Sequence, residues 1–294
     1  TETHFRYEPI FPLSNFLPHL NSMRKVTESS RTIPVLTECD VAVFGGGPSG
    51  VCAAAAAARA GKYVILVERH GFLGGMATAA WVNIIHSFYG MDKKTKIVGG
   101  LPEEFIRRLQ AQGAAYNLNP DGEIGDWVID SEIAKFVFDD IAIGSCVRLL
   151  FHTWLVGALR DGRRINAVLI EGKSGRLGII ADIYIDCTGD ADLIRRSGIE
   201  TQLGNGFACQ SPSLCFRIGG KEPEAAPLSK VAQELSRTPM DYNGQYYPAF
   251  LWGDEGVFSK GEYMMAGTRV LNVNCSDSLE FTRAEVEGRY QLRW

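Results

Sequence analysis

The sequence predicts an α/β fold built on a parallel sheet, and three adjacent features support this prediction. A short, continuous apolar run at residues 41–44 is typical of a parallel strand that is buried on both faces. A glycine-rich loop then leads into an alanine-rich segment with helical character. A second apolar run, at residues 63–67, ends at an acidic residue, Glu68. Strand, glycines, helix, strand and acidic residue in this order indicate a Rossmann-like unit that binds a nucleotide.

The loop has the spacing G-x-G-x-x-G, and each of its glycines has a separate steric task. Gly45 permits a tight turn out of the strand, and Gly47 lets a pyrophosphate approach the backbone without meeting a Cβ atom. Gly50 lets the following helix lie close to the strand. The helix opens with Pro48 and Ser49, and its unpaired N–H groups and positive dipole end favour a bound pyrophosphate.

Glu68 stands at the end of the second strand, where a carboxylate is placed to accept hydrogen bonds from both hydroxyls of a ribose. An acidic residue there repels a 2′-phosphate, which argues against NADP. This role concerns charge and hydrogen bonding rather than packing. We therefore expect Glu68→Gln to weaken cofactor binding with little effect on the thermal stability of the cofactor-free protein.

Local signals divide the middle of the chain into further elements. The alanine-rich helix is expected over residues 49–60. Pro102 near a first turn, early glutamates, later arginines and a glycine after the end predict a helix over residues 102–112. Asp130 or Ser131 begins another helix, which runs to about residue 141. Apolar runs separated by turn residues predict strands at residues 147–153, 155–160, 165–171 and 177–186, the last three joined as hairpins.

The two ends of the chain have different patterns. Residues 1–38 are rich in proline and aromatic residues, which indicates an arm packed against the body. After the last predicted hairpin we expect a short helix at residues 191–197, a strand at 214–218, a polar helix at 224–235, a strand at 269–274 and a closing helix at 278–292. The chain is thus predicted to comprise the arm, a nucleotide-binding domain at residues 39–200 with an insertion at about 81–129, and a partial α+β substrate domain at 201–294.

Composition excludes several classes of function. The 294 residues are 46% hydrophobic, enough to bury one large or two ordinary cores, and carry a net charge of −4 without a basic stripe, so a nucleic-acid partner is not expected. Glycines and a proline interrupt the uncharged stretch at residues 41–58, which argues against a membrane span. The amino terminus lacks the pattern of a secretion signal, and the seven cysteines are scattered, as expected of reduced thiols in a cytoplasmic protein. No C-x-x-C pair occurs, so no metal site is predicted.

Two further loops follow predicted strands, and together with the first they resemble a known family. The second loop reads Gly74-Gly75-Met76-Ala77-Thr78, and the third reads Asp186-Cys187-Thr188-Gly189-Asp190-Ala191-Asp192. With Glu68-Arg69 between the first and second loops, the chain resembles the FAD-dependent oxidoreductases of the glutathione-reductase-like flavoprotein superfamily. More narrowly, it looks like the family related to the flavin subunit of heterodisulfide reductase. Segments 210–217 and 282–288 share this likeness.

The resemblance implies FAD as cofactor and a Rossmann-like FAD-binding domain with a parallel sheet, a β-hairpin insertion and a partial α+β substrate domain. It implies that the acidic residue holds the adenosine ribose, the first two loops follow the pyrophosphate and flavin, and the third loop closes over the cofactor. The cofactor-binding residues expected on this basis are Gly45, Gly47, Pro48, Ser49, Gly50, Glu68, Arg69, Gly74, Gly75, Met76, Ala77, Thr78, Thr188, Gly189 and Asp190.

Two departures from the superfamily pattern keep other interpretations open. Residues 72–86 hold no cysteine pair, so dithiol chemistry has little support. No carboxyl-terminal return to the cofactor domain is visible after Thr282, which is compatible with a truncated flavoprotein fragment. Asp190 and Asp192 also suit simple capping of the helix that follows them.

The predicted activity is that of an FAD-dependent oxidoreductase, which transfers a hydride between a small-molecule substrate and the flavin. The alternatives are an NAD-dependent dehydrogenase and a non-catalytic nucleotide-binding subunit. His86 is the candidate catalytic residue, with Asn83 and Tyr89 nearby, although an isolated histidine in an apolar stretch is more often structural. Arg217 suits a substrate carboxylate or an ordinary strand-end surface position. An electron-transfer partner or a second copy of the chain remains open as a macromolecular partner.

Overall fold

A computed structural model describes residues 24–92, 94–118, 126–204, 209–219, 240–242, 245–247, 252–255 and 262–292. Its centre is a six-stranded sheet in the order β6-β2-β1-β9-β8-β7. Four of these strands are parallel, namely β6 (Arg148–Leu150), β2 (Val64–Val67), β1 (Val35–Phe44) and β9 (Gly175–Asp186). The antiparallel hairpin β7 (Trp154–Asp161) and β8 (Arg164–Gly172) continues the sheet from β9.

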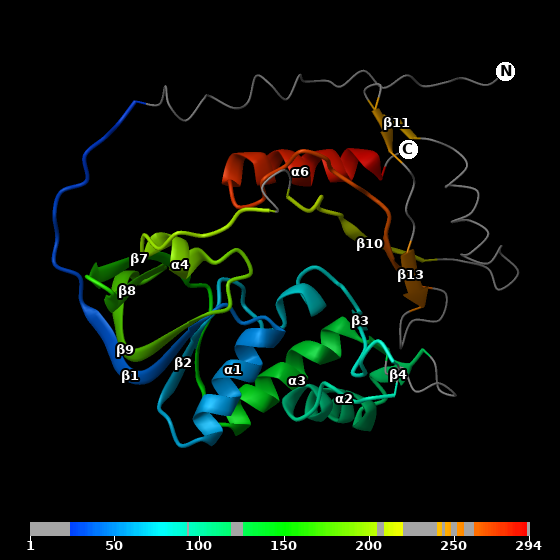
Figure 1. The fold of residues 1–294 in the computed structure, drawn as a ribbon, viewed down its shortest axis with the longest axis horizontal. Helices are drawn as coiled ribbons and strands as arrows, with labels where there is room; N and C mark the ends of the chain where they lie inside the picture. Colours follow the sequence, from blue (N-terminus) through cyan, green and yellow to red (C-terminus); the bar gives the residue numbers. More distant parts are fainter. Residues whose placement is uncertain are drawn as a thin grey trace, which may run out of the picture.

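Both faces of the parallel strands are covered, which explains their continuous apolar sequence. On one face, Val43 and Leu66 pack against α1 (Pro48–Arg59), α2 (Leu101–Ala111) and α3 (Ser131–Gly144). On the other face, Phe44 and Ile65 pack against residues of β7, β8 and α4 (Asp192–Arg196). Figure 1 shows α1, α2 and α3 grouped beside β1 and β2, with the β7–β8 hairpin and α4 away from these helices.

The predicted insertion contains a small antiparallel sheet in addition to α2. Its three strands have the order β3-β5-β4 and are β3 (Ile84–Ile85), β5 (Trp127–Ile129) and β4 (Ala115–Asn117). A 3-10 turn, η3 (Gly75–Ala77), precedes it within the second loop. The insertion therefore begins directly where that loop ends.

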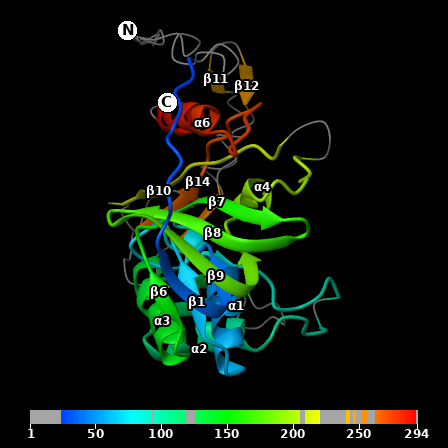
Figure 2. The ribbon, with the colours of Figure 1, turned by 90° about the vertical axis from the view of Figure 1, so that its left-hand side faces the viewer.

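A second layer lies beyond the carboxyl ends of the parallel strands. It holds α6 (Ser278–Gln291) and the antiparallel strands β10 (Cys215–Ile218), β14 (Tyr263–Ala266) and β13 (Trp252–Glu255), in the order β10-β14-β13. Strands β11 (Met240–Tyr242) and β12 (Gln245–Tyr247) form a separate hairpin. Figures 1 and 2 both show α6 and β10 above the sheet, on the side where α1 begins.

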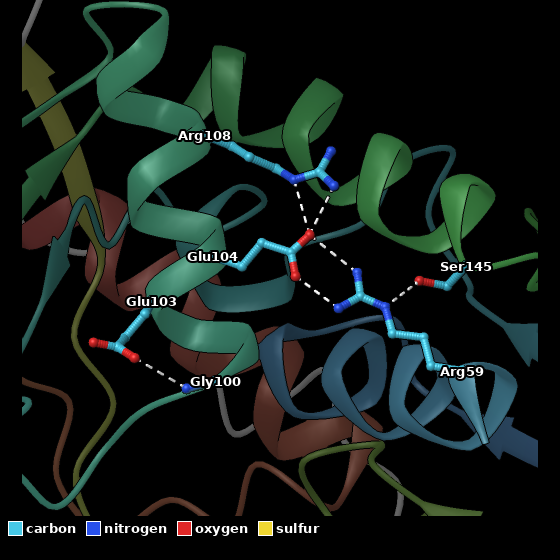
Figure 3. A network of polar contacts seen from close by, with 6 residues as sticks. All are labelled: Arg59, Gly100, Glu103, Glu104, Arg108 and Ser145. Atoms are coloured by element: carbon cyan, nitrogen blue, oxygen red, sulfur yellow. Dashed lines mark hydrogen bonds and ion pairs between the residues drawn. The ribbon is translucent and has the colours of Figure 1, made fainter.

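A network of ion pairs and hydrogen bonds joins α1, α2 and the end of α3, as Figure 3 shows. Arg59 at the end of α1 donates to both carboxylate oxygens of Glu104 on α2, at 2.6 and 3.0 Å. Arg108, one turn further along α2, donates to the same carboxylate at 2.7 Å. Arg59 also donates to the hydroxyl of Ser145, which ends α3. The Arg59 guanidinium lowers the pKa of Glu104 to about 2, with a smaller contribution from Arg108.

Most elements predicted for residues 39–200 form close to the predicted bounds, but two predictions along the chain are corrected. The first strand begins at Val35, so residues 35–38, predicted as part of the arm, pair with β9. The segment 269–274, predicted as a strand, is irregular because Asn272 has φ of +55°. Its apolar residues Val270 and Val273 pack against Ala284 of α6 instead of joining a ladder. Strand β14 was not predicted, and the polar helix predicted at 224–235 lies outside the described residues.

Candidate cofactor site

The first glycine loop leaves the carboxyl end of β1 in a conformation that requires two of its glycines. Gly45 has φ of +95°, and a Cβ atom there would lie 2.2 Å from the carbonyl oxygen of Cys187. A Cβ atom on Gly50 would lie 1.8 Å from the carbonyl oxygen of Gly45. The steric tasks predicted for these two glycines therefore agree with the geometry, since side chains would separate β1, β9 and α1.

Gly47 differs from its neighbours because the protein itself leaves room for a side chain there. Its φ is −68°, and the nearest described atom that a Cβ atom on Gly47 would meet is the Cα of Gly75, 3.9 Å away. A Cβ atom on Gly75, in contrast, would lie 2.9 Å from the Cα of Gly47. The amide of Gly74 also donates to the carbonyl of Gly46 at 2.8 Å. The first and second loops thus meet backbone to backbone, and beside this contact the protein leaves room for a Cβ atom at Gly47.

The N-terminus of α1 faces this space without a capping side chain among the described residues. Gly47 is the N-cap, Pro48 occupies the first turn and carries no N–H group, and the first turn has no acidic residue. A helix N-terminus with unpaired N–H groups and a positive dipole end is a site for a phosphate group. The residues here fit the pyrophosphate of a dinucleotide in charge and in available space.

Glu68 has a structural role that the sequence did not predict. Its side chain is buried, and its two oxygens accept hydrogen bonds from the amides of Gly46, at 2.6 Å, and His70, at 2.8 Å. The carboxylate therefore fixes the first loop to the end of β2. Each carboxylate oxygen has a second acceptor position, so the geometry is compatible with the expected ribose contact. However, the expectation that Glu68→Gln leaves the cofactor-free protein equally stable is corrected, because the substitution disrupts a buried pair of backbone contacts.

The second loop is held by its own side chains. The Thr78 hydroxyl donates to the carbonyl of Leu73 at 2.7 Å, and Thr78 is 1% exposed. Ala77 is buried beside it, whereas Met76 is 64% exposed. The hydroxyl of Thr78, expected to reach the cofactor, is instead directed into the loop. Contact between this loop and a ligand would fall to the backbone of Gly74 and Gly75 and to Met76.

The third loop depends on Asp186, which sequence reasoning left without a role. Its Oδ1 accepts hydrogen bonds from the amide and the hydroxyl of Thr188, and its Oδ2 accepts from the amide of Ile194. The Thr188 hydroxyl in turn accepts from the amide of Asp192 at 2.8 Å. Asp186 and Thr188 thus satisfy the first turn of α4. One feature of the sequence could have indicated this role, because Asp186 stands at the end of β9, the strand beside β1.

This geometry bears on the two acidic residues of the third loop. The N-cap of α4 is Ala191, with φ of +55°, and no side chain of the described residues caps it in the usual way. The alternative interpretation of Asp190 and Asp192 as helix caps is therefore wrong. Partial desolvation, followed by the Asp192 carboxylate, raises the pKa of Asp190, against an opposing effect of Arg69. The guanidinium of Arg69 also stacks over Trp154 at 5.5 Å.

The candidates outside the three loops lie on the insertion and the second layer. The side chain of His86 is 66% exposed, and its Nδ1 lies 3.5 Å from a carboxylate oxygen of Asp126. Asn83 is buried, and its Oδ1 has no hydrogen-bond partner among the residues described. The guanidinium of Arg217, on β10, lies 4.5 Å from the ring centroid of Trp81.

In the described part of the chain no cluster of three or more His, Cys, Asp or Glu side chains is arranged to hold a metal ion. No helix in that part is long and apolar enough to cross a membrane.

Comparison with known proteins indicates a dinucleotide cofactor, as does the geometry of the loops. A family model described as FAD dependent oxidoreductase matches residues 40–294, which is most of the chain and includes all three loops. No curated protein matches the chain significantly. The match favours FAD over the alternative of an NAD-dependent dehydrogenase.

Solved structures share the fold at low sequence identity. BexE, studied for oxidation during BE-7585A biosynthesis, has a TM-score of 0.53 and 16% identity, with 78% of this chain and 43% of BexE covered. A geranylgeranyl bacteriochlorophyll reductase-like protein from Thermoplasma acidophilum has a TM-score of 0.51 and 16% identity, with 78% and 56% covered. The myxobacterial halogenase CndH has a TM-score of 0.50 and 14% identity, with 86% and 57% covered. The chain thus spans about half the length of each of these three proteins.

Proposed function

Because the chain belongs to the family of FAD-dependent oxidoreductases, we propose that it oxidises or reduces a small molecule by hydride transfer to or from the flavin N5. FAD is the cofactor named for the family, and it supplies the group that accepts or donates the electrons. The residues of the chain bind and orient the two reactants and keep water from them.

The observation that carries this proposal is the space at Gly47. The two loops are in backbone contact beside it, and the uncapped N-terminus of α1 faces it. A protein that needed Gly47 only for folding would have a backbone that excludes a Cβ atom, as at Gly45 and Gly50. At Gly47 the need for glycine comes from a ligand instead, and a pyrophosphate suits the exposed N–H groups.

The other residues have assigned roles in this proposal. Glu68 accepts from the ribose hydroxyls through its remaining lone pairs, while it holds the first loop in place. Gly74 and Gly75 direct backbone amides towards the pyrophosphate and flavin. Thr188 and Asp186 fix the backbone of the third loop, so that Gly189 and Asp190 close over the cofactor. The layer with α6 and β10 lies over the same end of the sheet (Figure 1), and in this proposal it limits the access of water to the reactants.

The visible spectrum of the purified protein tests the cofactor, and a matched pair of variants tests the site. Gly47→Val should give a folded protein without flavin absorbance, because the side chain fills space that the protein leaves open. Gly144→Val is the control, since Gly144 is exposed at the end of α3 and a Cβ atom there meets no described atom within 4 Å. If Gly47→Val binds FAD as tightly as the parent, the assignment of this loop is wrong.

Two alternative functions predict different results from the same samples. A colourless protein that binds NAD would favour a dehydrogenase that uses the same fold. A protein that binds FAD but whose flavin exchanges electrons with no organic substrate would favour a non-catalytic subunit. We further propose a cytoplasmic location, from the scattered cysteines, and a separate electron-transfer partner or a second copy of the chain as the macromolecular partner.

A further inference from the structure

We propose that Arg217, stacked on the ring of Trp81, binds a carboxylate group of the substrate, so that the small molecule in the proposed reaction is an organic acid. This inference rests on the proposed function, because it names the substrate class of the same site. It depends on two residues from different parts of the fold, one beside the second cofactor loop and the other on the sheet of the second layer.

The two residues meet where the cofactor domain faces the second layer. Trp81 follows the second loop, three residues after Thr78, and Arg217 is the third residue of β10. The guanidinium carbon lies 4.5 Å from the centroid of the Trp81 ring. The second loop is in backbone contact with the first loop, the one proposed to bind the pyrophosphate, and this supports a position near the cofactor for a group bound by Arg217.

Trp81 is held in an uncommon backbone conformation. Its φ is +53°, in the left-handed region, where a bulky side chain is strained. The next residue, Val82, donates from its amide to the carbonyl of Met76 at 2.9 Å, which closes the turn around Trp81. Backbone strain of this kind persists only where the surroundings enforce it, and it concentrates at ligand sites. The result is a fixed aromatic platform at the exit of the cofactor loop.

Within the described residues the guanidinium of Arg217 makes no hydrogen bond, so its donors can serve a ligand. Its ionic partner among the described residues is Glu262, with 3.7 Å between Nη1 and Oε2, which is longer than a hydrogen bond. The two side chains are 40% and 45% exposed. A guanidinium carries five N–H donors, and its planar fork matches a carboxylate through two parallel hydrogen bonds. Stacking on an indole ring fixes the plane of that fork while its edge stays open.

Another interpretation is that the pair only joins the two layers of the protein. The two interpretations differ in what happens to an added carboxylate. If Arg217 is a binding residue, Glu262 competes with the ligand for the same cation. Removing the charge of Glu262 would then strengthen binding, and removing the charge of Arg217 would weaken it. If the pair is only a structural contact, neither substitution changes the affinity for a carboxylate.

The experiment uses the full chain loaded with FAD and benzoate as the probe, with benzamide as a neutral molecule of the same shape. Binding is followed by the shift of the flavin absorbance bands and, in the cofactor-free protein, by tryptophan fluorescence. We expect benzoate to bind the parent more tightly than benzamide. Arg217→Gln should weaken benzoate binding by about tenfold or more, Arg217→Lys should weaken it by less, and Glu262→Gln should strengthen it by several fold.

Equal affinity of all four proteins for benzoate, or equal affinity of the parent for benzoate and benzamide, would overturn the inference. Thermal unfolding of each variant shows whether it is folded, and the opposite directions expected for Arg217→Gln and Glu262→Gln cannot both come from misfolding. The proposed function fails separately, because a parent protein that does not retain FAD contradicts it whatever benzoate does.

Discussion

The amide of Gly46 donates a 2.6 Å hydrogen bond to the carboxylate of Glu68. This contact links the loop after β1 to the residue after β2, so the side chain proposed to bind the ribose also fixes the loop. Glu68→Gln keeps the shape of the side chain, but one of its ends becomes an NH2 group that opposes a backbone N–H donor. We expect the cofactor-free protein to lose about 1–3 kcal/mol of stability and FAD to bind more weakly.

Urea unfolding and FAD titration of the same Glu68→Gln preparation check this prediction. Glu38→Gln is the matched control, because Glu38 is an exposed acid on the neighbouring strand β1. A variant that unfolds at the same urea concentration as the parent would show that the backbone contacts of Glu68 contribute nothing measurable to stability.

Asp186 should act as a positioning residue for the third loop. The carboxylate of Asp186 accepts three hydrogen bonds, and Asp186→Asn replaces it with a neutral amide. Thr188→Val removes the hydroxyl that accepts from the amide of Asp192. Hydrogen exchange in residues 187–194 should become faster in both variants, and FAD should bind about tenfold more weakly. Thr188→Ser keeps the hydroxyl and should restore both properties. Unchanged exchange in Thr188→Val would contradict the assignment.

Two glycine substitutions should separate folding from ligand binding. Gly50→Ala places a Cβ atom 1.8 Å from the carbonyl oxygen of Gly45, and backbone cannot move aside cheaply. It should therefore destabilise the cofactor-free protein. Gly47→Ala meets no described atom closer than 3.9 Å, so it should unfold at the same temperature as the parent. Thermal unfolding of both variants without FAD measures the difference. An equal loss of thermal stability in the two variants would contradict the prediction that only Gly50 is needed for folding.

Glu104 should make stability depend on pH in the acidic range. Its pKa in the folded protein is lowered from 4.5 to about 2, first by the Arg59 hydrogen bond. A depressed pKa contributes stability that is fully present above the unfolded value and is lost as the pH falls towards the folded value. Glu104→Gln should thus cost about 1–2 kcal/mol at pH 7, a figure reduced for solvent screening, and progressively less between pH 4.5 and pH 2.

Denaturant unfolding of the parent and Glu104→Gln across this range measures the difference. Glu132→Gln is a suitable control, since its pair with Lys135 lies on the surface of α3. A stability difference that stays constant down to pH 2 would mean that the Arg59–Glu104 contact does not depend on the charge of the carboxylate.

Local signals predicted most of the cofactor domain. Asp130 caps α3 through its side chain, as its position before an apolar helix indicated, and the glycines of the first loop sit at a strand-to-helix turn. The segment 269–274 was predicted wrongly because its apolar composition suits a strand, whereas the left-handed Asn272 and the packing under α6 decide its conformation. Asp186 and Glu68 have their roles because they accept hydrogen bonds from the backbone amides of other segments, Ile194 and Gly46 respectively. The spacing of residues in the sequence does not predict such contacts.

The pairing of β1 with β9 determines which parts of the chain must be present before the first glycine loop can fold. Cys39 and Ile180, 141 positions apart in the sequence, are in contact across these strands, and Gly45 rests on Cys187. Closing so long a loop costs conformational entropy before the contacts between the two strands can stabilise it. Folds with many such long-range contacts tend to fold slowly. A ribosome-bound chain that has emerged only as far as residue 150 contains the glycine fingerprint but lacks the strand on which it rests. We therefore expect the chain to bind FAD only after β9 (Gly175–Asp186) has been synthesised.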